Sequence, residues 1–296
     1  GLSFGHDTPL LCISTPHPRT HPSGTRHELR AVAGGRVIPL HSKAALAMMQ
    51  PDADFRQRCE ALLVGLREAV RCELPPGWQV APFGSYVQGT CLPGAALDVA
   101  LVSSGREGLS SLVTGDPDAG NAVEDLASAL VRRTDVFTML PSAPSISLEE
   151  ESGPVRLLAG DMQELALYLG DSATGRLDYL IRLLLDSHPG AREVVLCVKK
   201  WARDRGLLVG QAPGSSFPWT MLALFSLQQQ GLLPPLRELS NARPSSPPQQ
   251  SLGAMLHDFA ELLLAHLERP EPRPEISIWA GSFLPTPGGA ALATVA

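Results

Sequence analysis

The residues best suited to chemistry lie between Pro82 and Val102. A strand-like run ends in Gly84-Ser85, and the short apolar run that follows carries Asp98. Small residues in such a turn let backbone N–H groups face a phosphate, and a carboxylate on the next strand can reach a metal ion held there. A Gly-Ser turn alone is weak evidence, because most such turns only connect two strands. The segment predicts a phosphate site only in combination with other residues.

A basic pair at helical spacing is the second candidate. Lys199 and Arg203 are four residues apart in Arg192–Arg205, a segment whose apolar residues recur with helical period, so both side chains project from one face. The chain has three lysines in all, and the other two are Lys43 and Lys200. A solvated basic helix face is the common reading of such a pair, and a phosphate grip is the alternative.

The elements that would position these residues follow from hydrophobic period and from helix breakers. Helical spacing predicts a helix over Asp54–Cys72, which Pro75-Pro76-Gly77 ends. Strands are expected over Trp78–Phe83, Leu97–Val102, Val136–Leu140, Val155–Ala159 and Leu165–Leu169. Further helices are expected over Gly120–Arg133, Arg192–Arg205, Phe217–Gln229 and Leu252–Leu267.

This mixture of elements predicts an α+β fold: a palm built on a mixed sheet with helices, packed on a mostly helical domain. We expect residues 1–45 to be flexible and residues 46–182 to hold an N-terminal helix and the palm. Residues 183–285 would form the helical domain, against which the N-terminal helix would also pack, and residues 286–296 would be a frayed tail.

Four segments occur in an order that carries a resemblance. The run from Gly84 to Asp98 is similar to the pattern apolar-Gly-Ser-aromatic, Gly, then Leu-Pro-x-Ser-Asp-apolar-Asp. The matching positions are Gly84, Ser85, Tyr86, Gly89, Leu92, Pro93, Leu97 and Asp98. The other three segments are Val194–Leu207, Gly214–Phe217, and Leu252–Phe259 with Glu275–Ile278. Together, over about residues 50–285, they resemble the polymerase-β-like nucleotidyltransferases, in the branch of poly(A) polymerases and terminal uridylyltransferases with a PAP-associated domain.

The resemblance implies a nucleoside triphosphate in the cleft between palm and helical domain. It implies that Gly84 and Ser85 face the phosphates, that Lys199 and Arg203 grip them, that the Ser216 hydroxyl meets a phosphate, and that the Phe217 ring stacks on the base. Phe217 stands where the family has Tyr, so the ring keeps its stacking face and loses the hydroxyl. A core aromatic at the start of a buried helix is an equal alternative for Phe217.

The acidic metal site departs from the family pattern. The family has three carboxylates that hold two Mg²⁺ or Mn²⁺ ions; here Ala96 stands at the first position and Ala166 aligns with the third. Asp98 is the only survivor and the expected catalytic residue and metal ligand. An engineered change could explain Ala96, but natural degeneration also explains Ala166 and Ala95, which stands where Ser is usual. We therefore prefer degeneration.

Other acidic residues leave an alternative open. Asp161, Glu164 or Asp171 could supply a missing carboxylate. The family's sugar-contacting Asn is also absent, with Leu177 or Asp178 near its place.

The expected function is that of a degenerate member, catalytically inactive, that serves as an RNA-associated or scaffolding subunit in a protein complex. The alternative is an active, Mg²⁺-dependent, template-independent RNA 3′-terminal adenylyl- or uridylyltransferase. In that case the partners are an RNA 3′ end and ATP or UTP, whereas an inactive protein needs no metal cofactor. A third option is an interaction module that binds neither RNA nor nucleotide.

Composition bounds these readings. The net charge of −6 and a pI near 5.8 argue against coating nucleic acid through bulk charge, and leave room for a local basic groove. No apolar run approaches the roughly 20 residues that span a bilayer. Five widely separated cysteines favour reduced thiols in an intracellular protein. Because the chain begins with Gly1, we expect a fragment or processed product, so that a signal for a mitochondrion or another organelle could precede it.

Overall fold

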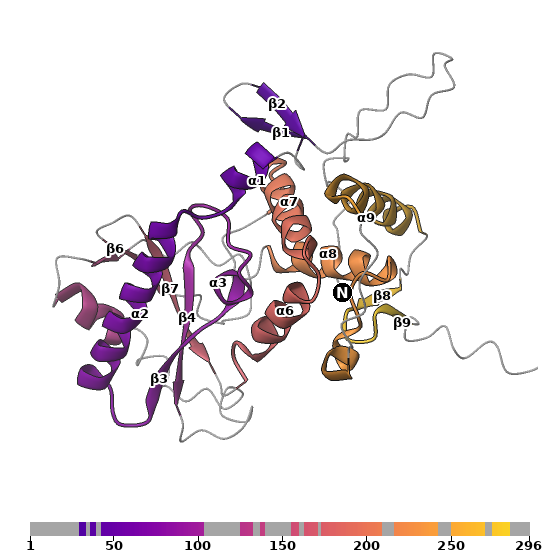
Figure 1. Ribbon diagram of the computed structural model, residues 1–296. Helices are drawn as coiled ribbons and strands as arrows, with labels where there is room; N and C mark the ends of the chain where they lie inside the picture. Colours follow the sequence, from indigo (N-terminus) through magenta and orange to yellow (C-terminus); the bar gives the residue numbers. More distant parts are fainter. Residues whose placement is uncertain are drawn as a thin grey trace, which may run out of the picture.

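The computed structural model describes residues 30–33, 36–39, 43–103, 125–132, 137–139, 155–159, 163–170, 173–208, 216–241, 250–269 and 274–284. Figure 1 shows a sheet-containing half and a helical half lying side by side. Within the first 45 residues, which were expected to be flexible, β1 (Arg30–Ala33) and β2 (Arg36–Pro39) form an antiparallel pair. The expected tail, 286–296, lies outside the described residues. Among the described helices, none is long and apolar enough to cross a membrane.

The first half is built on one mixed sheet. Its strands, in spatial order, are β3 (Trp78–Pro82), β4 (Leu97–Ser103), β7 (Glu164–Gly170), β6 (Val155–Ala159) and β5 (Phe137–Met139). β4 and β7 run parallel, and every other neighbouring pair is antiparallel. Each of the five strand predictions is confirmed, and the sheet agrees with the expected α+β palm.

One face of this sheet is apolar because alternate strand residues point the same way. α2 (Ala53–Glu73) and the helix over 125–132 pack on it, as Figure 1 shows for α2. The side chain of Asp52 caps α2 by accepting a hydrogen bond from the Phe55 N–H at 2.6 Å. The buried residues of this face and its helices are Phe55, Cys59, Leu63, Leu66, Val70, Leu97, Val99, Leu101, Leu126, Ala127, Leu130, Leu157, Leu165 and Leu167.

The position of α2 corrects an expectation. The N-terminal helix was expected to pack with the helical domain, yet α2 buries its apolar stripe against the sheet. Only the short α1 (Lys43–Met49), through Ala45 and Met49, joins the core of the helical half. The apolar period of α2 predicts a buried stripe but does not say which surface covers it.

The helical half surrounds a second core. Its elements are α6 (Arg176–Asp186), α7 (Ala191–Asp204), α8 (Phe217–Gln229), η1 (Leu236–Asn241) and α9 (Leu252–Leu267), with the hairpin strands β8 (Glu275–Ser277) and β9 (Ser282–Leu284). α7 is buried over most of its length, and its residues pack against α8 and α9. Placing α7 at the centre holds its two predicted phosphate ligands against the palm.

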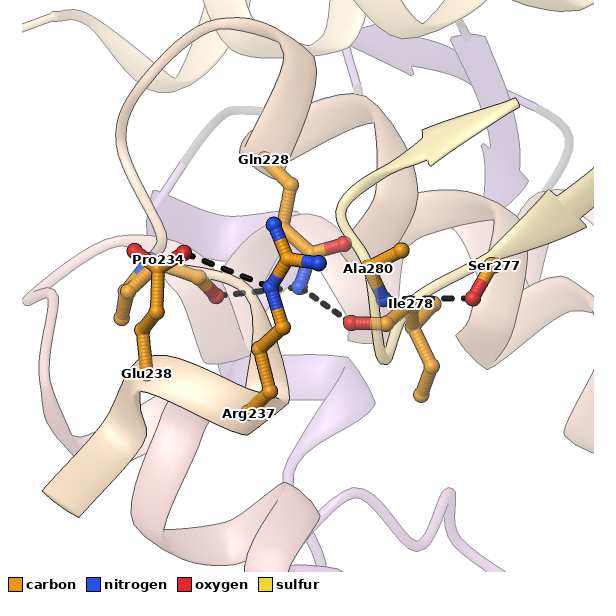
Figure 2. A network of polar contacts seen from close by, with 7 residues as sticks. All are labelled: Gln228, Pro234, Arg237, Glu238, Ser277, Ile278 and Ala280. Carbon is orange, nitrogen blue, oxygen red and sulfur yellow. Dashed lines mark hydrogen bonds and ion pairs between the residues drawn. The ribbon is translucent and has the colours of Figure 1, made fainter. Parts of the chain in front are cut away.

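A side-chain amide attaches the β8–β9 hairpin to α8. Figure 2 shows Gln228 reaching from α8, where its Nε2 donates to the carbonyl oxygens of Pro234 and Ile278 at 3.0 and 2.9 Å. The Ser277 hydroxyl accepts from the Ala280 N–H at 3.1 Å and closes the hairpin turn. The Ile278 carbonyl oxygen at this turn thus has a donor on α8, which holds the segment that contains Glu275–Ile278 to the helical core.

Candidate functional site

Asp98 lies on the sheet face opposite α2, in a row of three directly paired residues. It pairs with Ala166 across the parallel β4–β7 contact, and Ala166 pairs with Arg156 across β7–β6. Side chains of paired residues project from the same face. The position that the alignment gave to the third carboxylate is therefore next to Asp98, but it holds a methyl group, with an arginine beyond it.

The Gly-Ser turn lies against Asp98, as expected. The N–H of Phe83 donates to the backbone oxygen of Asp98 at 3.1 Å, which aligns the end of β3 with β4. Gly84 has φ +68°, and a Cβ atom there would stand 2.7 Å from Asp98 Oδ2. Only glycine fits this contact without displacing the carboxylate. Ser85 follows in α3 (Gly84–Gln88), where its carbonyl oxygen accepts from the Thr90 N–H at 2.9 Å.

A second carboxylate, Asp178, occupies the start of α3. Its Oδ2 accepts from the Gly84 N–H at 2.9 Å, and its Oδ1 accepts from Gln88 Nε2 at 2.6 Å. The Asp178 residue is 8% exposed. The N–H that was expected to face a phosphate thus donates to an anion from the chain itself.

Some charges around Asp98 raise the pKa of its carboxyl group and others lower it. Burial raises the pKa of the Asp98 carboxyl to about 6; among the charged neighbours Lys199 and Arg156 lower it, and Asp178 and Glu164 raise it. Burial, with the nearby Asp98 charge, also raises the pKa of Tyr168. Tyr168 packs edge-on against Phe83, with ring centroids 5.1 Å apart. The site is a partly buried polar surface with a net excess of carboxylates.

Glu164, an expected substitute for the missing carboxylates, is engaged elsewhere. It forms an ion pair with Arg156 on the neighbouring strand. Its register places it on the same face as Asp98 and Ala166, two residues before Ala166 on β7. The other two candidates, Asp161 and Asp171, lie outside the described residues.

Lys199 and Arg203 both reach the loop between α3 and β4. Lys199 is 3% exposed, and its Nζ donates to the Thr90 carbonyl oxygen at 2.8 Å, with Thr90 Oγ1 at 3.4 Å. Burial lowers the pKa of Lys199 to about 8. Arg203 is exposed, and its Nη1 donates to the Pro93 carbonyl oxygen at 3.0 Å. A solvated face therefore describes Arg203 but not Lys199.

Ser216 and Phe217 begin α8. The Ser216 carbonyl oxygen accepts from the Thr220 N–H and hydroxyl at 3.1 and 3.2 Å, and the Ser216 side chain makes no capping hydrogen bond. Phe217 is half-buried and packs on the core of the helical half. Gly214 and Ser215, which precede them in the predicted motif, lie outside the described residues. Base stacking by Phe217 stays a prediction.

The described residues do not fit a two-metal site at Asp98. Ala96 and Ala166 offer no oxygen from their side chains, Glu164 is paired with Arg156, and both Asp178 oxygens already accept hydrogen bonds. In the described part of the chain, three or more His, Cys, Asp or Glu ligand atoms gather only at His257, Asp258 and Glu261 on α9. That cluster is formed by neighbours on α9, a helix of the helical half, whereas Asp98 lies on β4 of the sheet.

Comparison with known proteins gives the fold. No family profile matches the sequence, and no curated protein does. Solved structures match at low identity: mtPAP in complex with UTP has a TM-score of 0.66 at 18% identity and covers 82% of this chain and 57% of that chain. The GLD-2/RNP-8 complex has a TM-score of 0.61 at 17% identity and covers 82% and 79%. Terminal uridylyl transferase 4 from Trypanosoma brucei with bound GTP has a TM-score of 0.59 at 16% identity and covers 77% and 72%.

The chain has the nucleotidyltransferase fold of poly(A) polymerases and terminal uridylyltransferases. This confirms the resemblance that the four ordered segments predicted, as far as the fold. The chain spans a little over half the length of the mtPAP chains that it matches, 57% to 58%. At these identities the match shows the fold alone.

Within this nucleotidyltransferase fold, the sequence missed two residues that shape the site. Asp178 was noted only as a neighbour of the absent Asn, and Arg156 was not singled out. The sequence does hold a signal for Asp178, because it is an acidic residue in the first turn of α6. A carboxylate in that position can also reach the N-terminus of a neighbouring helix. Arg156 gives no such signal, because its role depends on strand register.

Proposed function

We propose that this nucleotidyltransferase-fold protein has lost catalysis and acts as an RNA-associated or scaffolding subunit. The observation that carries this proposal is the row Asp98–Ala166–Arg156. Two-metal phosphoryl transfer needs several anionic oxygens to hold the ions that clamp the attacking and leaving oxygens. A methyl group and a cation beside Asp98 supply neither the oxygens nor the negative charge that the ions need.

The phosphate side of the cleft supports the same proposal. The Gly84 N–H donates to Asp178, and Lys199 donates to Thr90. A triphosphate would have to displace an internal carboxylate from Gly84 and draw out a buried lysine before it gained these contacts. Both displacements cost free energy, because they leave buried polar groups without partners until the ligand replaces them.

One observation favours an active enzyme as the second candidate. Asp178 lies close enough to Asp98 to raise the pKa of the Asp98 carboxyl, so two carboxylates approach the Gly84 turn from different elements. An active RNA 3′-terminal adenylyl- or uridylyltransferase would need Asp178 to leave Gly84 and share a Mg²⁺ ion with Asp98. Its partners would be an RNA 3′ end and ATP or UTP.

The solved neighbours bear on the partners. mtPAP structures contain UTP, GTP or CTP, and GLD-2 is in complex with RNP-8. We propose, by analogy, that this chain binds a protein partner, and that its function depends more on this partner than on any retained binding of nucleotide. A scaffolding role requires the shape of the fold and not its metal chemistry.

The deciding experiment combines calorimetry with a tailing assay. ATP and UTP are titrated into the protein with and without Mg²⁺, and a labelled short RNA is incubated with each nucleotide. We expect no tailing, and no strengthening of nucleotide binding by Mg²⁺. Asp98→Ala is the matched variant. Tailing by the wild type that disappears in Asp98→Ala would overturn the proposal in favour of the active enzyme. Tailing that persists in Asp98→Ala would indicate a contaminating activity, and the preparation would be repurified before scoring.

A further inference from the structure

α6 carries a concentration of exposed apolar side chains. Seven large hydrophobic residues are exposed in the described part of the chain, and three of them lie on this one helix of 11 residues. These are Leu177 at 43%, Tyr179 at 56% and Leu183 at 39% exposure. The opposite side of α6 is buried through Asp178, Ile181, Leu184 and Leu185. The exposed residues are therefore not needed for the helix to pack on its own core.

Two arginines flank the exposed ring. Arg176 and Arg182 are both exposed, three residues before and three residues after Tyr179. At the rise of a helix the two positions are about 9 Å apart along the axis. Among the described contacts neither guanidinium makes a hydrogen bond or an ion pair. The acidic residue on this side, Asp186, is paired with Arg192 at 2.5 Å.

We call Arg176, Tyr179, Arg182 and Leu183 the α6 outer face. With helical spacing these four residues fall on one side of α6. Its charge is positive, although the whole chain carries −6. A local basic surface on an acidic protein was left open by composition, and this is where the described residues place one.

The α6 outer face begins beside the Gly-Ser turn. Asp178, the residue before Tyr179, bonds the Gly84 N–H, so the first turn of α6 is fixed against α3. Gly175, with φ +82°, would place a Cβ atom 3.2 Å from the Pro82 carbonyl oxygen, so the helix start also approaches the end of β3 closely. Figure 1 shows α6 next to α3, between the two halves of the molecule.

We infer that the α6 outer face binds single-stranded RNA. Tyr179 would stack on a base, and Arg176 and Arg182 would contact phosphates on either side. Proteins bind single strands in this way, with aromatic rings as stacking surfaces and basic residues along the backbone. Because neither arginine side chain has a partner in the described part of the chain, this face favours a polyanion over an apolar protein partner, which would have to bury both charges without counter-ions. The inference rests on the proposed function, because it gives the RNA-associated subunit its contact surface.

Fluorescence anisotropy with a labelled oligouridine RNA of about 15 nucleotides tests this surface. Titrations are done at several salt concentrations. We expect Tyr179→Ala to weaken binding by roughly 5- to 150-fold, the loss that removal of one stacking aromatic side chain typically causes. We expect the double variant Arg176→Gln/Arg182→Gln to lower the log–log salt slope by about 1.4, from two lost phosphate contacts on a single strand.

The matched control is the double variant Val64→Ala/Arg67→Gln on α2. Both residues are exposed, and Val64 is 64% exposed, so the control removes an apolar group and an arginine from a helix on the other side of the palm. We expect its affinity and salt slope to equal those of the wild type. A control that weakens binding as much as the α6 variants would mean non-specific attraction and would overturn the inference.

The remaining outcomes are also decisive. Wild-type protein that does not bind the RNA, or α6 variants that bind as the wild type does, would overturn the inference. So would concentration-dependent self-association, measured by light scattering, that Tyr179→Ala abolishes without any effect on RNA binding, because the face would then be a protein interface. The tailing assay tests the proposed loss of catalysis separately. If the protein tails RNA and the α6 variants still weaken RNA binding, only the proposed loss of catalysis is overturned. If the protein does not tail RNA and the α6 variants bind RNA as the wild type does, only the inference about the α6 outer face is overturned.

Discussion

The backbone N–H of Gly84 donates to Asp178 Oδ2 at 2.9 Å, which places an internal carboxylate at the start of α3. The same carboxylate holds Gln88 through its other oxygen, so one side chain of α6 fixes both ends of the five-residue α3. In a phosphate-binding turn this position is the place for a ligand anion. The relationship makes Asp178 part of the fold's stability, and it can be measured.

Asp178→Ala should lower the free energy of unfolding by about 1–3 kcal/mol, because it leaves the Gly84 N–H and the Gln88 amide without their acceptor. Urea denaturation measures the change. Asp186→Ala is the control: Asp186 lies on the same helix, but its ion pair with Arg192 is exposed and should contribute less than about 1 kcal/mol. Equal losses in the two variants would contradict the assigned role of Asp178.

Gly84→Ala should destabilise the protein more than Gly94→Ala does. Both glycines have positive φ, +68° and +74°, which costs an alanine about 1–2 kcal/mol. A Cβ at Gly84 also meets Asp98 Oδ2 at 2.7 Å, whereas nothing lies within 4 Å at Gly94. The difference between the two, measured by urea denaturation, isolates the contact with Asp98. It should shrink when Gly84→Ala is made in an Asp98→Ala background, and an unchanged difference would count against the contact.

Asp98→Asn should stabilise the protein near neutral pH, by on the order of 1–3 kcal/mol. The folded-state pKa of Asp98, about 6, is above its ordinary value of 3.8, so between these values the folded state binds more protons than the unfolded state. Wild-type stability should therefore fall as pH rises from about 4 through 6. The variant should lose that part of the profile in a series of denaturation curves. A profile that is the same in both proteins would refute the burial of the Asp98 charge.

Lys199→Met should change how the free energy of unfolding depends on pH in the alkaline range, as measured by urea denaturation at several pH values. Because burial lowers the pKa of Lys199 from 10.5 to about 8, the unfolded state binds more protons between these values, and the lysine makes the protein more stable as pH rises through that window. Burial of Cys197 acts in the opposite direction, since it raises the pKa of that thiol to about 12. The difference between wild type and variant isolates the lysine, with Lys200→Met as the control for loss of a neighbouring lysine.

The double variant Ala96→Asp/Ala166→Asp should acquire Mg²⁺-dependent stability. It places two carboxylates around Asp98, and an ion bound at millimolar affinity raises the melting temperature by a few degrees at about 10 mM Mg²⁺. The wild type should show no such shift. The triple variant with Asp98→Ala in addition should lose the gain. A wild-type protein that responds to Mg²⁺ as strongly as the double variant would instead support the active enzyme.

The fold could be predicted because its signals are local. Period-2 and period-3.6 runs gave the five strands and the principal helices, and ordered motifs gave the nucleotidyltransferase type. The Gly84–Asp98 contact was also predictable, since a strand–turn–strand segment brings its two ends together. These features depend on residues that are near one another in the chain.

Contacts across elements could not be predicted in the same way. Asp178 lies 94 residues from Gly84, and Lys199 lies 109 residues from Thr90. A basic residue at helical spacing looks the same in the sequence whether it faces a cleft or a backbone carbonyl group. Burial decides between these, and burial is a property of the packed domains. The same limit explains why α2 was assigned to the wrong surface.

The bond from Lys199 to the Thr90 carbonyl oxygen has a consequence for shape. In a two-domain enzyme whose cleft closes on its substrate, contacts with the ligand hold the halves together and release them afterwards. Here a side chain of α7 joins the halves without any ligand, and Arg203 adds a second connection one turn later. We expect one outline in solution, the same before and after any nucleotide is added. A surface formed by both halves would then keep one conformation, and a protein partner could bind it whether or not nucleotide is present.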